Sequence, residues 1–354
     1  MPEHADPPRL RARMRAALLR WYDLNRRDLP WRRTRDPYAI WVSETMLQQT
    51  QVATVLPYYH RFMEAFPSVE ALDRAPLDTV RSTWSGLGYY RRALNLKHAA
   101  GVLVSRHRGR LPDDYDALLK LPGVGRYTAG AVMSIAFQRP YPAVDGNVRR
   151  VYARLFGLTD PKAVDEAARR MVSRSRPGDF NQALMELGAT VCLPGTPLCE
   201  RCPLAHWCRA RASGSFELPR RRRVETKAVE WSLVIIESES RILLHRRPDD
   251  GLLAGLWELP APETLPPAVA EASLAGPPIA VIRHAITDKR ITAPVYLLRR
   301  KVRVRGKAWR WVDLARLSSY PLSSLCTKAL RAARPRLGGR PQPLPTPGFP
   351  LPRE

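Results

Sequence analysis

A tight apolar turn with helical patterns on both sides constrains this 354-residue chain more than any other feature. The turn is Leu121-Pro-Gly-Val-Gly125, and apolar residues at helical spacing precede it and follow it over 128–137. Gly123 and Gly125 let the backbone approach a nucleic-acid phosphate closely, and the next helix offers unpaired N–H groups at its N-terminus. The pattern predicts a helix-hairpin-helix, with an ordinary helical turn as the alternative for this segment alone.

Two acidic residues stand out against this background. Asp145 lies twenty residues beyond Gly125 in a polar break, Val144-Asp-Gly-Asn-Val148, that opens a new amphipathic run, so helix capping explains part of its presence. Glu44 lies in a helix predicted over 38–51, along its apolar stripe. A desolvated carboxyl there has a raised pKa and can keep a proton to donate. A solvated or salt-bridged Glu at the margin of the stripe is the alternative.

The charge balance indicates a polyanionic partner. The chain has 58 Lys and Arg against 33 Asp and Glu, a formal net charge of +25, and only eight of the basic residues are Lys. Arg richness can also follow from genome composition, so it favours nucleic acid without locating a site. No stretch approaches the ~20 apolar residues of a membrane span, and the first residues do not resemble a signal peptide. We expect no membrane partner and a location in the cytoplasm, associated with the nucleoid.

Four of the five cysteines cluster within 17 residues. Their spacing is C-x6-C-x2-C-x5-C, formed by Cys192, Cys199, Cys202 and Cys208. In a chain expected inside the cell, four thiols this close indicate a metal site rather than disulfides. Spacing alone does not separate structural zinc from an iron–sulfur cluster. Cys326 stands apart in a helical stretch and is predicted to be a core thiol.

A glycine-rich loop precedes the hairpin. Its sequence is Gly86-Leu-Gly-Tyr-Tyr-Arg-Arg92, so two aromatic and two basic side chains follow the glycines. Aromatic rings that wedge into a base stack and arginines that hold phosphates require this combination. A pair of core tyrosines is the alternative interpretation.

The pattern changes from helical to extended in the C-terminal third. A basic linker is predicted over 213–228 with Arg220–Arg223 in it, followed by a domain over 229–335 and a Pro-rich, disordered tail over 336–354. Within that domain the sequence predicts a hairpin of strands 231–236 and 241–245. Two more strands over 291–298 and 308–312 and a helix over 323–333 complete the prediction. Residues 1–212 are predicted to be mainly α-helical.

These motifs together resemble the adenine DNA glycosylases of the MutY type, within the helix-hairpin-helix superfamily of base-excision glycosylases. The stretch WVSETMLQQTQVATVLPYY, the loop GLGYY, the hairpin with VDGN and the cysteine spacing each resemble that family. The resemblance implies a helical glycosylase domain with an iron–sulfur loop at 192–208, and an α+β Nudix-like C-terminal domain that lacks the Glu-rich metal helix of the Nudix hydrolases. It also implies a [4Fe–4S] cluster held by the four clustered cysteines.

The resemblance assigns roles residue by residue. Glu44 is expected to be the catalytic acid, Asp145 to stabilise the cationic sugar, and Tyr127 and Asn147 to orient the two acids. Tyr127 matches the position of a Lys in enzymes of the endonuclease III type, and Tyr cannot form a Schiff base, so base removal without strand cleavage is expected. The residues expected to contact DNA are Gln48, Gln49, Tyr89, Arg91, Gly123, Gly125 and Arg126.

The lesion-recognition loop departs from the family pattern. The family reads 8-oxoguanine through Phe-Ser-His, and this chain has Ile286-Thr287-Asp288 at the matching place. Thr287 keeps the hydroxyl, whereas Asp288 is an acceptor only. His284 is expected to be a packed structural residue or a donor to DNA.

The expected reaction is hydrolysis of the N-glycosidic bond of adenine mispaired with 8-oxoguanine or guanine in duplex DNA, by a monomeric, monofunctional enzyme. Two alternatives stay open. A bifunctional pyrimidine glycosylase/lyase shares the hairpin and the cysteines, and Tyr127 argues against it. A non-catalytic DNA-binding or cluster-sensing protein would leave the pairing of Glu44 with Asp145 unexplained.

Overall fold

The structure is a computed structural model that describes residues 7–216 and 225–338. The described residues form two compact units that do not follow chain order. The first comprises 7–49, 68–73 and 98–216, and the second comprises 50–67, 74–97 and 225–338. Among the described residues, no helix combines the length and the apolar character that a membrane crossing needs.

The first unit is helical, and four of its helices share one core. Apolar faces of α1, α9, α10 and α11 meet around fully buried side chains such as Leu18, Tyr152 and Phe180. Asp145 and Asp160 cap the N-termini of α9 and α10 with their carboxylates, which fixes where these helices begin. The helices of this unit are α1 (Pro8–Asn25), α2 (Pro37–Leu47), α4 (Val69–Arg74), most of α6 (Arg91–His107), α7 (Tyr115–Leu119), α8 (Arg126–Ile135), α9 (Gly146–Phe156), α10 (Pro161–Met171), α11 (Pro177–Thr190) and α12 (Arg209–Ser213).

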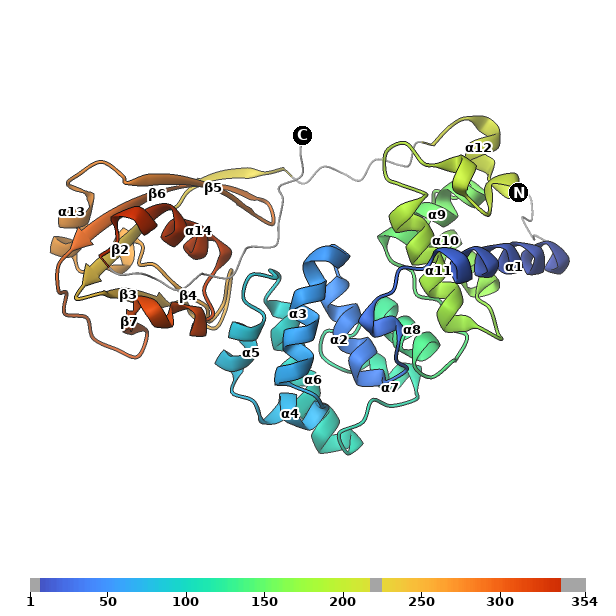
Figure 1. Ribbon diagram of the computed structural model, residues 1–354, viewed down its shortest axis with the longest axis horizontal. Helices are drawn as coiled ribbons and strands as arrows, with labels where there is room; N and C mark the ends of the chain where they lie inside the picture. The colour runs from blue at the N-terminus through green and yellow to red at the C-terminus, as the bar shows by residue number, and fades with distance from the viewer. Residues whose placement is uncertain (1–6, 217–224, 339–354) are drawn as a thin grey trace. The chain divides into compact units, whose positions relative to one another are not determined.

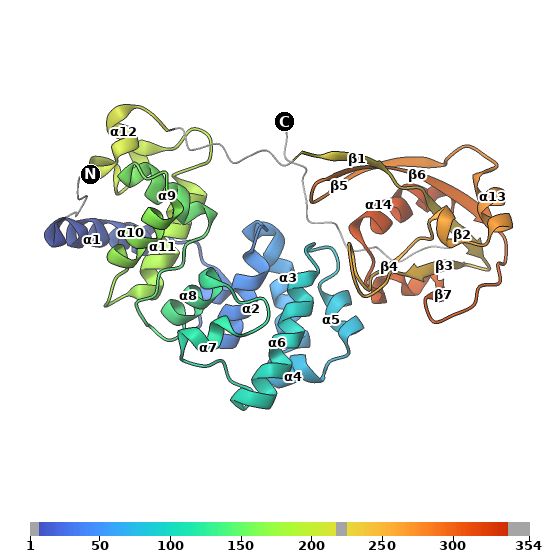
Figure 2. The same ribbon diagram turned by 180° about the vertical axis from the view of Figure 1, so that it is seen from behind.

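The predicted hairpin joins α7 to α8, which lie side by side in Figures 1 and 2. Leu121 and Val124 are buried beneath the turn. Gly123 adopts a φ of +77°, a left-handed conformation that glycine reaches without a Cβ penalty. The turn therefore holds two helices together with its apolar residues while its glycines face outward.

The second unit contains a seven-stranded sheet and three helical segments from the N-terminal half of the chain. Strand order is β1-β6-β2-β3-β4, with β5 paired to β6 and β7 paired to β3. Strands β1 and β2 run parallel to β6, and the remaining pairs are antiparallel. The elements are α3 (Val52–Ala65), α5 (Leu77–Thr83), the start of α6, β1 (Lys227–Glu230), β2 (Leu233–Ser238), β3 (Arg241–Arg246), β4 (Trp257–Glu258), α13 (Pro267–Leu274), β5 (Ala280–Ile286), β6 (Lys289–Arg299), β7 (Trp309–Asp313) and α14 (Ser324–Ala333).

Strand β2 is buried on both faces of the sheet. Alternate residues point to opposite sides, so Leu233 and Ile235 join one core and Val234 and Ile236 join the other. Helix α14 covers the first of these faces beside β5 and β6, as Figure 1 shows. Cys326 lies in this core and is buried, which confirms the prediction of a core thiol.

Several sequence predictions need correction. Helix α2 ends at Leu47 rather than Gln51, because Gln48 leaves the helical ψ range and Gln49 takes a left-handed φ of +55°. Strands β1, β4 and β5 were not predicted, and Lys227 and Ala228 belong to β1 instead of a linker. The basic run Arg220–Arg223 and the tail beyond residue 338 lie outside the described residues.

Candidate active site

Glu44 is a buried acid on α2. Its side chain is 4% exposed, and its carboxylate accepts a hydrogen bond of 2.5 Å from the hydroxyl of Tyr127 on α8. Burial raises the pKa of Glu44 to about 7; the Tyr127 hydrogen bond opposes this rise and the charge of Asp145 adds to it. Of the two interpretations of the sequence, the buried acid is therefore correct and the solvated one is wrong.

Asp145 lies at the N-cap of α9, partly buried. One carboxylate oxygen accepts a 2.7 Å bond from the backbone N–H of Val148, and the other accepts a 3.2 Å bond from the Asn147 amide. Burial raises the pKa of Asp145, and these hydrogen bonds act against the rise by favouring the ionised form. The charge of Asp145 raises the pKa of both Glu44 and Tyr127, so these three groups lie near enough to interact electrostatically.

Tyr127 forms a hydrogen bond with one of the two acids. Its hydroxyl donates to Glu44 and lies 3.7 Å from the sulfur of Met185. In the described part of the chain it makes no hydrogen bond to Asp145, so the expected bridge between the acids is present on one side only. Burial and the two carboxylates hold the pKa of Tyr127 well above 10, so it is a neutral donor near neutral pH.

Arg150 connects this site to the cysteine segment, and the sequence analysis did not identify it. Its guanidinium donates to the Asn147 amide oxygen at 2.7 Å and to the carbonyl oxygens of Gly188 and Cys192, each at 2.8 Å. Asn147 and Arg150 are three residues apart on α9, which places them on one helical face. That spacing is the sequence pattern from which Arg150 could have been predicted to lie beside Asn147. Close packing also requires glycine at Gly188, because a Cβ there would lie 2.6 Å from the Cβ of Asn147.

The hairpin presents a surface suited to an anion. Gly123, Gly125 and Arg126 are exposed, and nothing lies within 4 Å of the place where a Cβ on Gly125 would stand. No side chain caps the N-terminus of α8, so its first backbone N–H groups point outward with the positive end of the helix dipole. This is the geometry that binds phosphate.

The two glutamines differ in environment. Gln48 donates from its amide to the hydroxyl of Thr128 at 3.1 Å, which ties the end of α2 to α8. Gln49 is exposed at the turn that follows α2. Gln49 is therefore the more exposed of the two, and it follows the helix that carries Glu44.

The glycine-rich loop belongs to the second unit. Of its two tyrosines and of its two arginines, one is exposed and the other is more buried. Tyr89 is 46% exposed, whereas Tyr90 is partly buried. Arg91 is exposed, whereas Arg92 is buried, and burial lowers its pKa to about 10. Tyr90 is therefore the more buried of the two tyrosines, and the wedge role of Tyr89 stays a prediction.

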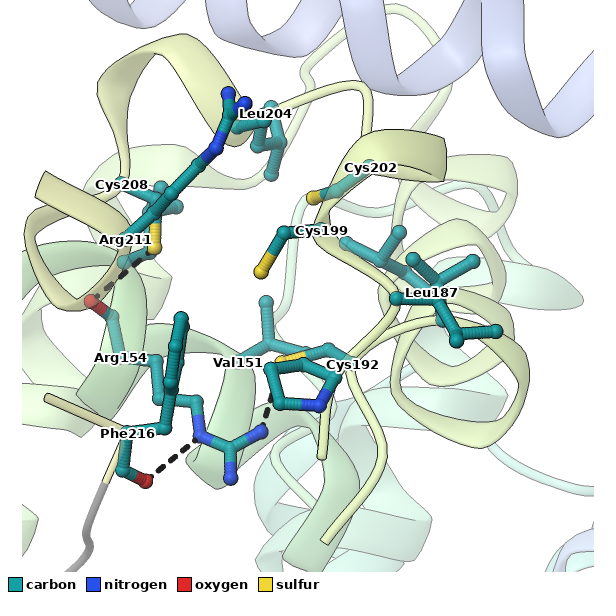
Figure 3. Close-up of a pocket in the computed structure, with 15 residues that line it drawn as sticks. Val151, Arg154, Leu187, Cys192, Cys199, Cys202, Leu204, Cys208, Arg211 and Phe216 are labelled. Carbon is teal, nitrogen blue, oxygen red and sulfur yellow. Dashed lines mark hydrogen bonds between the residues drawn. The ribbon is translucent and has the colours of Figure 1, made fainter. Parts of the chain in front are cut away.

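The four clustered cysteines line one cavity, which Figure 3 shows with their sulfurs around a common space. All four are free thiols, and apolar side chains such as Val151, Leu187 and Leu204 form its walls. Arg154 lies against Cys192 at 3.6 Å and donates to the carbonyl oxygen of Leu193. Within residues 7–216 and 225–338, no three Cys, His, Asp or Glu side chains are arranged to hold a single metal ion.

The proposed lesion loop is the two-residue turn of the β5–β6 hairpin. Thr287 has a φ of +53°, and its hydroxyl bonds to its neighbour Asp288 at 3.0 Å. That bond lowers the pKa of Asp288, which is partly exposed and ionised at neutral pH. His284 lies 3.3 Å from the amine of Lys328 on α14, and its pKa falls to about 4, chiefly through burial.

Comparison with known proteins assigns both halves of the chain. Residues 42–176 match the model of the HhH-GPD superfamily of base-excision DNA repair proteins, and residues 232–332 match the NUDIX domain. An adenine DNA glycosylase of Buchnera aphidicola is 36% identical over 253 residues, covering 69% of this chain and 72% of that protein. The chain belongs to the adenine DNA glycosylase family. The human adenine DNA glycosylase is 41% identical over 310 residues, covering 70% of this chain and 57% of that protein.

The adenine DNA glycosylase family includes longer members. This chain spans 47–60% of the length of the mammalian and plant relatives it matches. Among solved structures, a thermostable thymine-DNA glycosylase is 34% identical with a TM-score of 0.55, covering 58% of this chain and 98% of that chain. A trapped endonuclease III–DNA covalent intermediate is 25% identical with a TM-score of 0.52, covering 59% and 99%.

Membership of the adenine DNA glycosylase family confirms the resemblance stated from the sequence. The fold class is confirmed as well: a helix-hairpin-helix glycosylase domain precedes a Nudix-like domain with a sheet. The catalytic, DNA-contact and lesion-loop residues stay predictions, and so does the division of the chain near residues 213–228.

Proposed function

We propose that this protein hydrolyses the N-glycosidic bond of adenine mispaired with 8-oxoguanine or guanine in duplex DNA. The observation that carries the proposal is the buried Glu44 carboxyl, with a pKa of about 7, near enough to Asp145 for the two charges to interact. A base extruded from the duplex costs a few kcal/mol to unstack, least where pairing is already faulty, and this favours mispaired adenine.

Glu44 supplies the proton. At pH 7 a carboxyl with a pKa of about 7 is roughly half protonated, so a proton donor is available without acidic conditions. The proton moves to a ring nitrogen of the extruded adenine, and the glycosidic bond breaks with its electron pair leaving on the base. Water then adds its hydroxyl to the sugar carbon and releases a proton, so the products are adenine and an abasic site.

Asp145 acts on the sugar. The positive charge that develops on the sugar as the base leaves is stabilised by a carboxylate, or captured by it transiently, as in retaining glycosidases. Hydrogen bonds from Asn147 and from the N–H of Val148 favour the ionised form that this role needs. Arg150 holds Asn147 from the other side, so the amide is fixed when it donates.

Tyr127 favours base removal without strand cleavage. A lyase needs an amine that forms a Schiff base with the sugar, and a neutral phenol does not supply one. The similarity to an endonuclease III covalent complex keeps a bifunctional enzyme as the second candidate. Borohydride trapping of a protein–DNA adduct would support that candidate, and its absence supports the monofunctional enzyme.

A [4Fe–4S] cluster is the group proposed for the cysteine cavity. Four thiols around one apolar cavity fit a cluster liganded by Cys192, Cys199, Cys202 and Cys208. Burial and the neighbouring sulfurs raise the pKa of Cys202 to about 11, so a cationic centre is what would hold these groups as thiolates. Bound there, the cluster would order the loop. Iron analysis should give about four iron ions per chain; one zinc per chain would identify the other metal site that the spacing allows.

The remaining parts of the proposal concern binding. The exposed hairpin glycines, Arg126, Arg91 and Gln49 are proposed to contact DNA, with Tyr89 as the wedge beside the lesion. The tip formed by Thr287 and Asp288 is proposed to face the base opposite adenine. A monomeric protein in the cytoplasm, associated with the nucleoid and with no membrane partner, fits this activity.

One experiment tests the reaction and its specificity together. Labelled duplexes carrying adenine opposite 8-oxoguanine, guanine, cytosine or thymine are incubated with the protein, and strand breaks are measured with and without alkali. We expect breaks only after alkali and only opposite 8-oxoguanine and guanine. Breaks without alkali indicate a lyase, and no breaks in any duplex reject the proposed function.

A further inference from the structure

The loop that carries Tyr89 is fastened to the C-terminal domain by one backbone oxygen. The Leu322 carbonyl accepts a 3.1 Å hydrogen bond from the hydroxyl of Ser85 and a 3.0 Å hydrogen bond from the hydroxyl of Tyr90. Tyr90 also accepts the backbone N–H of Gly86 at 3.1 Å. A carbonyl oxygen has two lone pairs, so these two donors saturate it. Residues more than 230 positions apart are thereby joined within one compact unit.

The acceptor is itself immobilised by the sheet. Leu322 forms a bridge with Trp257 of β4, and the N–H of Trp257 donates to the carbonyl of Pro321 at 2.9 Å. Leu322 is buried in the core that α14 and the sheet share. The oxygen that receives Ser85 and Tyr90 is therefore fixed by the C-terminal fold, not by the loop.

The loop needs outside support because its backbone is unusual. Gly86, Gly88 and Tyr89 have φ values of +96°, +78° and +49°, and the last is costly for a residue with a Cβ. The Gly88 carbonyl accepts bonds from the indole of Trp84 at 3.0 Å and from Arg92 at 3.2 Å. These bonds close the loop around an exposed Tyr89 ring.

A second contact holds the helix before the loop. Arg81 of α5 has a side chain 4% exposed and lies 3.3 Å from the carboxylate of Asp249, in the β3–β4 connection. Arg246 of β3 reaches back to Asp78 of α5 at 3.3 Å. Gly255 lies against Arg81 so closely that a Cβ there would overlap the guanidinium. Helix α5 before the loop and the residues Ser85 and Tyr90 of the loop therefore both contact the C-terminal domain.

We infer that the C-terminal domain positions the Tyr89 wedge through the Leu322 carbonyl, with Ser85 and Tyr90 as positioning residues for mispair recognition. The inference rests on the proposed function, because Tyr89 is a wedge only in a protein that opens DNA. Loss of one hydroxyl leaves the buried carbonyl with one donor in place of two, and loss of both leaves it without either donor. The loop then relaxes from its left-handed conformation, and the Tyr89 ring is no longer held in the orientation that mispair recognition needs.

The test is a double-mutant cycle in the full chain. Affinity for a duplex with uncleavable 2′-fluoroadenosine opposite 8-oxoguanine, relative to a matched duplex, is measured for wild type, Tyr89→Ala, Ser85→Ala/Tyr90→Phe and the triple variant. We expect the Ser85/Tyr90 variant to lose about five- to tenfold of mispair preference, of the order of one or two hydrogen bonds. The triple variant should be within twofold of Tyr89→Ala, because both changes act through the same ring.

Matched controls separate positioning from folding. Ser85→Thr keeps the hydroxyl and Ser85→Val has the same shape without it, so only the second should lose preference. Ser82→Ala removes a hydroxyl that bonds within α5, to the carbonyl of Thr79, and should change nothing.

Three results would overturn the inference. The first is a Ser85/Tyr90 variant whose mispair preference stays within twofold of wild type. The second is an equal mispair preference in Ser85→Thr and Ser85→Val. The third is a triple variant whose loss of mispair preference is the product of the separate losses. A wild-type protein that shows no mispair preference at all rejects the proposed function instead, so the two failures are distinguishable.

Discussion

The acid pair and the tip of the β5–β6 hairpin differ in how far their polar side chains are removed from solvent. Glu44 is buried, bonded to Tyr127 and shifted in pKa by its surroundings. Thr287 is exposed and Asp288 partly exposed, and the Thr287 hydroxyl bonds only to its chain neighbours Ile286 and Asp288. Proton transfer at neutral pH requires a desolvated carboxyl, so its surroundings are built into the core. A turn at the surface can change its residues without unfolding the domain, so the proposed recognition turn is less constrained by the fold than the acid pair is.

The largest expected effect is at the acid pair. Glu44→Gln should reduce single-turnover adenine release by about 10²–10⁴-fold, the usual contribution of a general acid. Asp145→Asn should reduce it by about 10²–10³-fold through lost stabilisation of the charged sugar. Asn is a good N-cap, so α9 stays folded in this variant. Mispair affinity serves as the control and should be unchanged; release within tenfold of wild type in either variant contradicts the assigned role.

The pH dependence of adenine release should also depend on the buried acid. Glu44 must be protonated to act, and its pKa is raised to about 7, so activity should be full below that pH and fall above it. The single-turnover rate is expected to drop about tenfold per pH unit in the alkaline limb. The residual rate of Glu44→Gln should lack this limb. An alkaline limb that persists in Glu44→Gln would assign it to another group.

The sequence was informative where local chemistry leaves a pattern. The hairpin, the N-cap at Asp145 and the clustered cysteines each have a fixed spacing, and each was located from it. The end of α2 was missed because no Gly or Pro marks it; the left-handed Gln49 stops the helix beside Thr128.

Long-range contacts left no signal of their own in the sequence. Strand β5 was missed. Its residues alternate between exposed and partly buried positions because they pair with β6, and the sequence of β5 alone does not show that pairing. No spacing links Ser85 or Tyr90 to Leu322, so the sequence did not show that the glycine-rich loop packs on the C-terminal domain.

A smaller effect is expected at the hairpin tip. Asp288→His replaces an ionised acceptor beside anionic DNA with a donor, so discrimination of 8-oxoguanine from guanine should rise by about three- to tenfold. Relative excision rates opposite the two bases measure it. Asp288→Asn is the control that removes charge while keeping size. If Asn does as well as His, charge repulsion and not a missing donor limits recognition; if neither changes the ratio, the tip does not read the opposite base.

The smallest expected effect is on stability at the same turn. Thr287 is β-branched and held at a φ of +53°, a conformation that Asn adopts more readily, so Thr287→Asn should raise the free energy of unfolding by about 0.5–1 kcal/mol. Ser240 provides a matched position, with a φ of +60° in the two-residue turn between β2 and β3, where no DNA contact is proposed. Ser240→Asn should stabilise comparably and leave mispair preference unchanged. Denaturant unfolding and mispair binding of both variants decide whether the strain at Thr287 serves recognition: preference should fall in Thr287→Asn alone, and equal preference in both variants would make the strain an incidental feature of the turn.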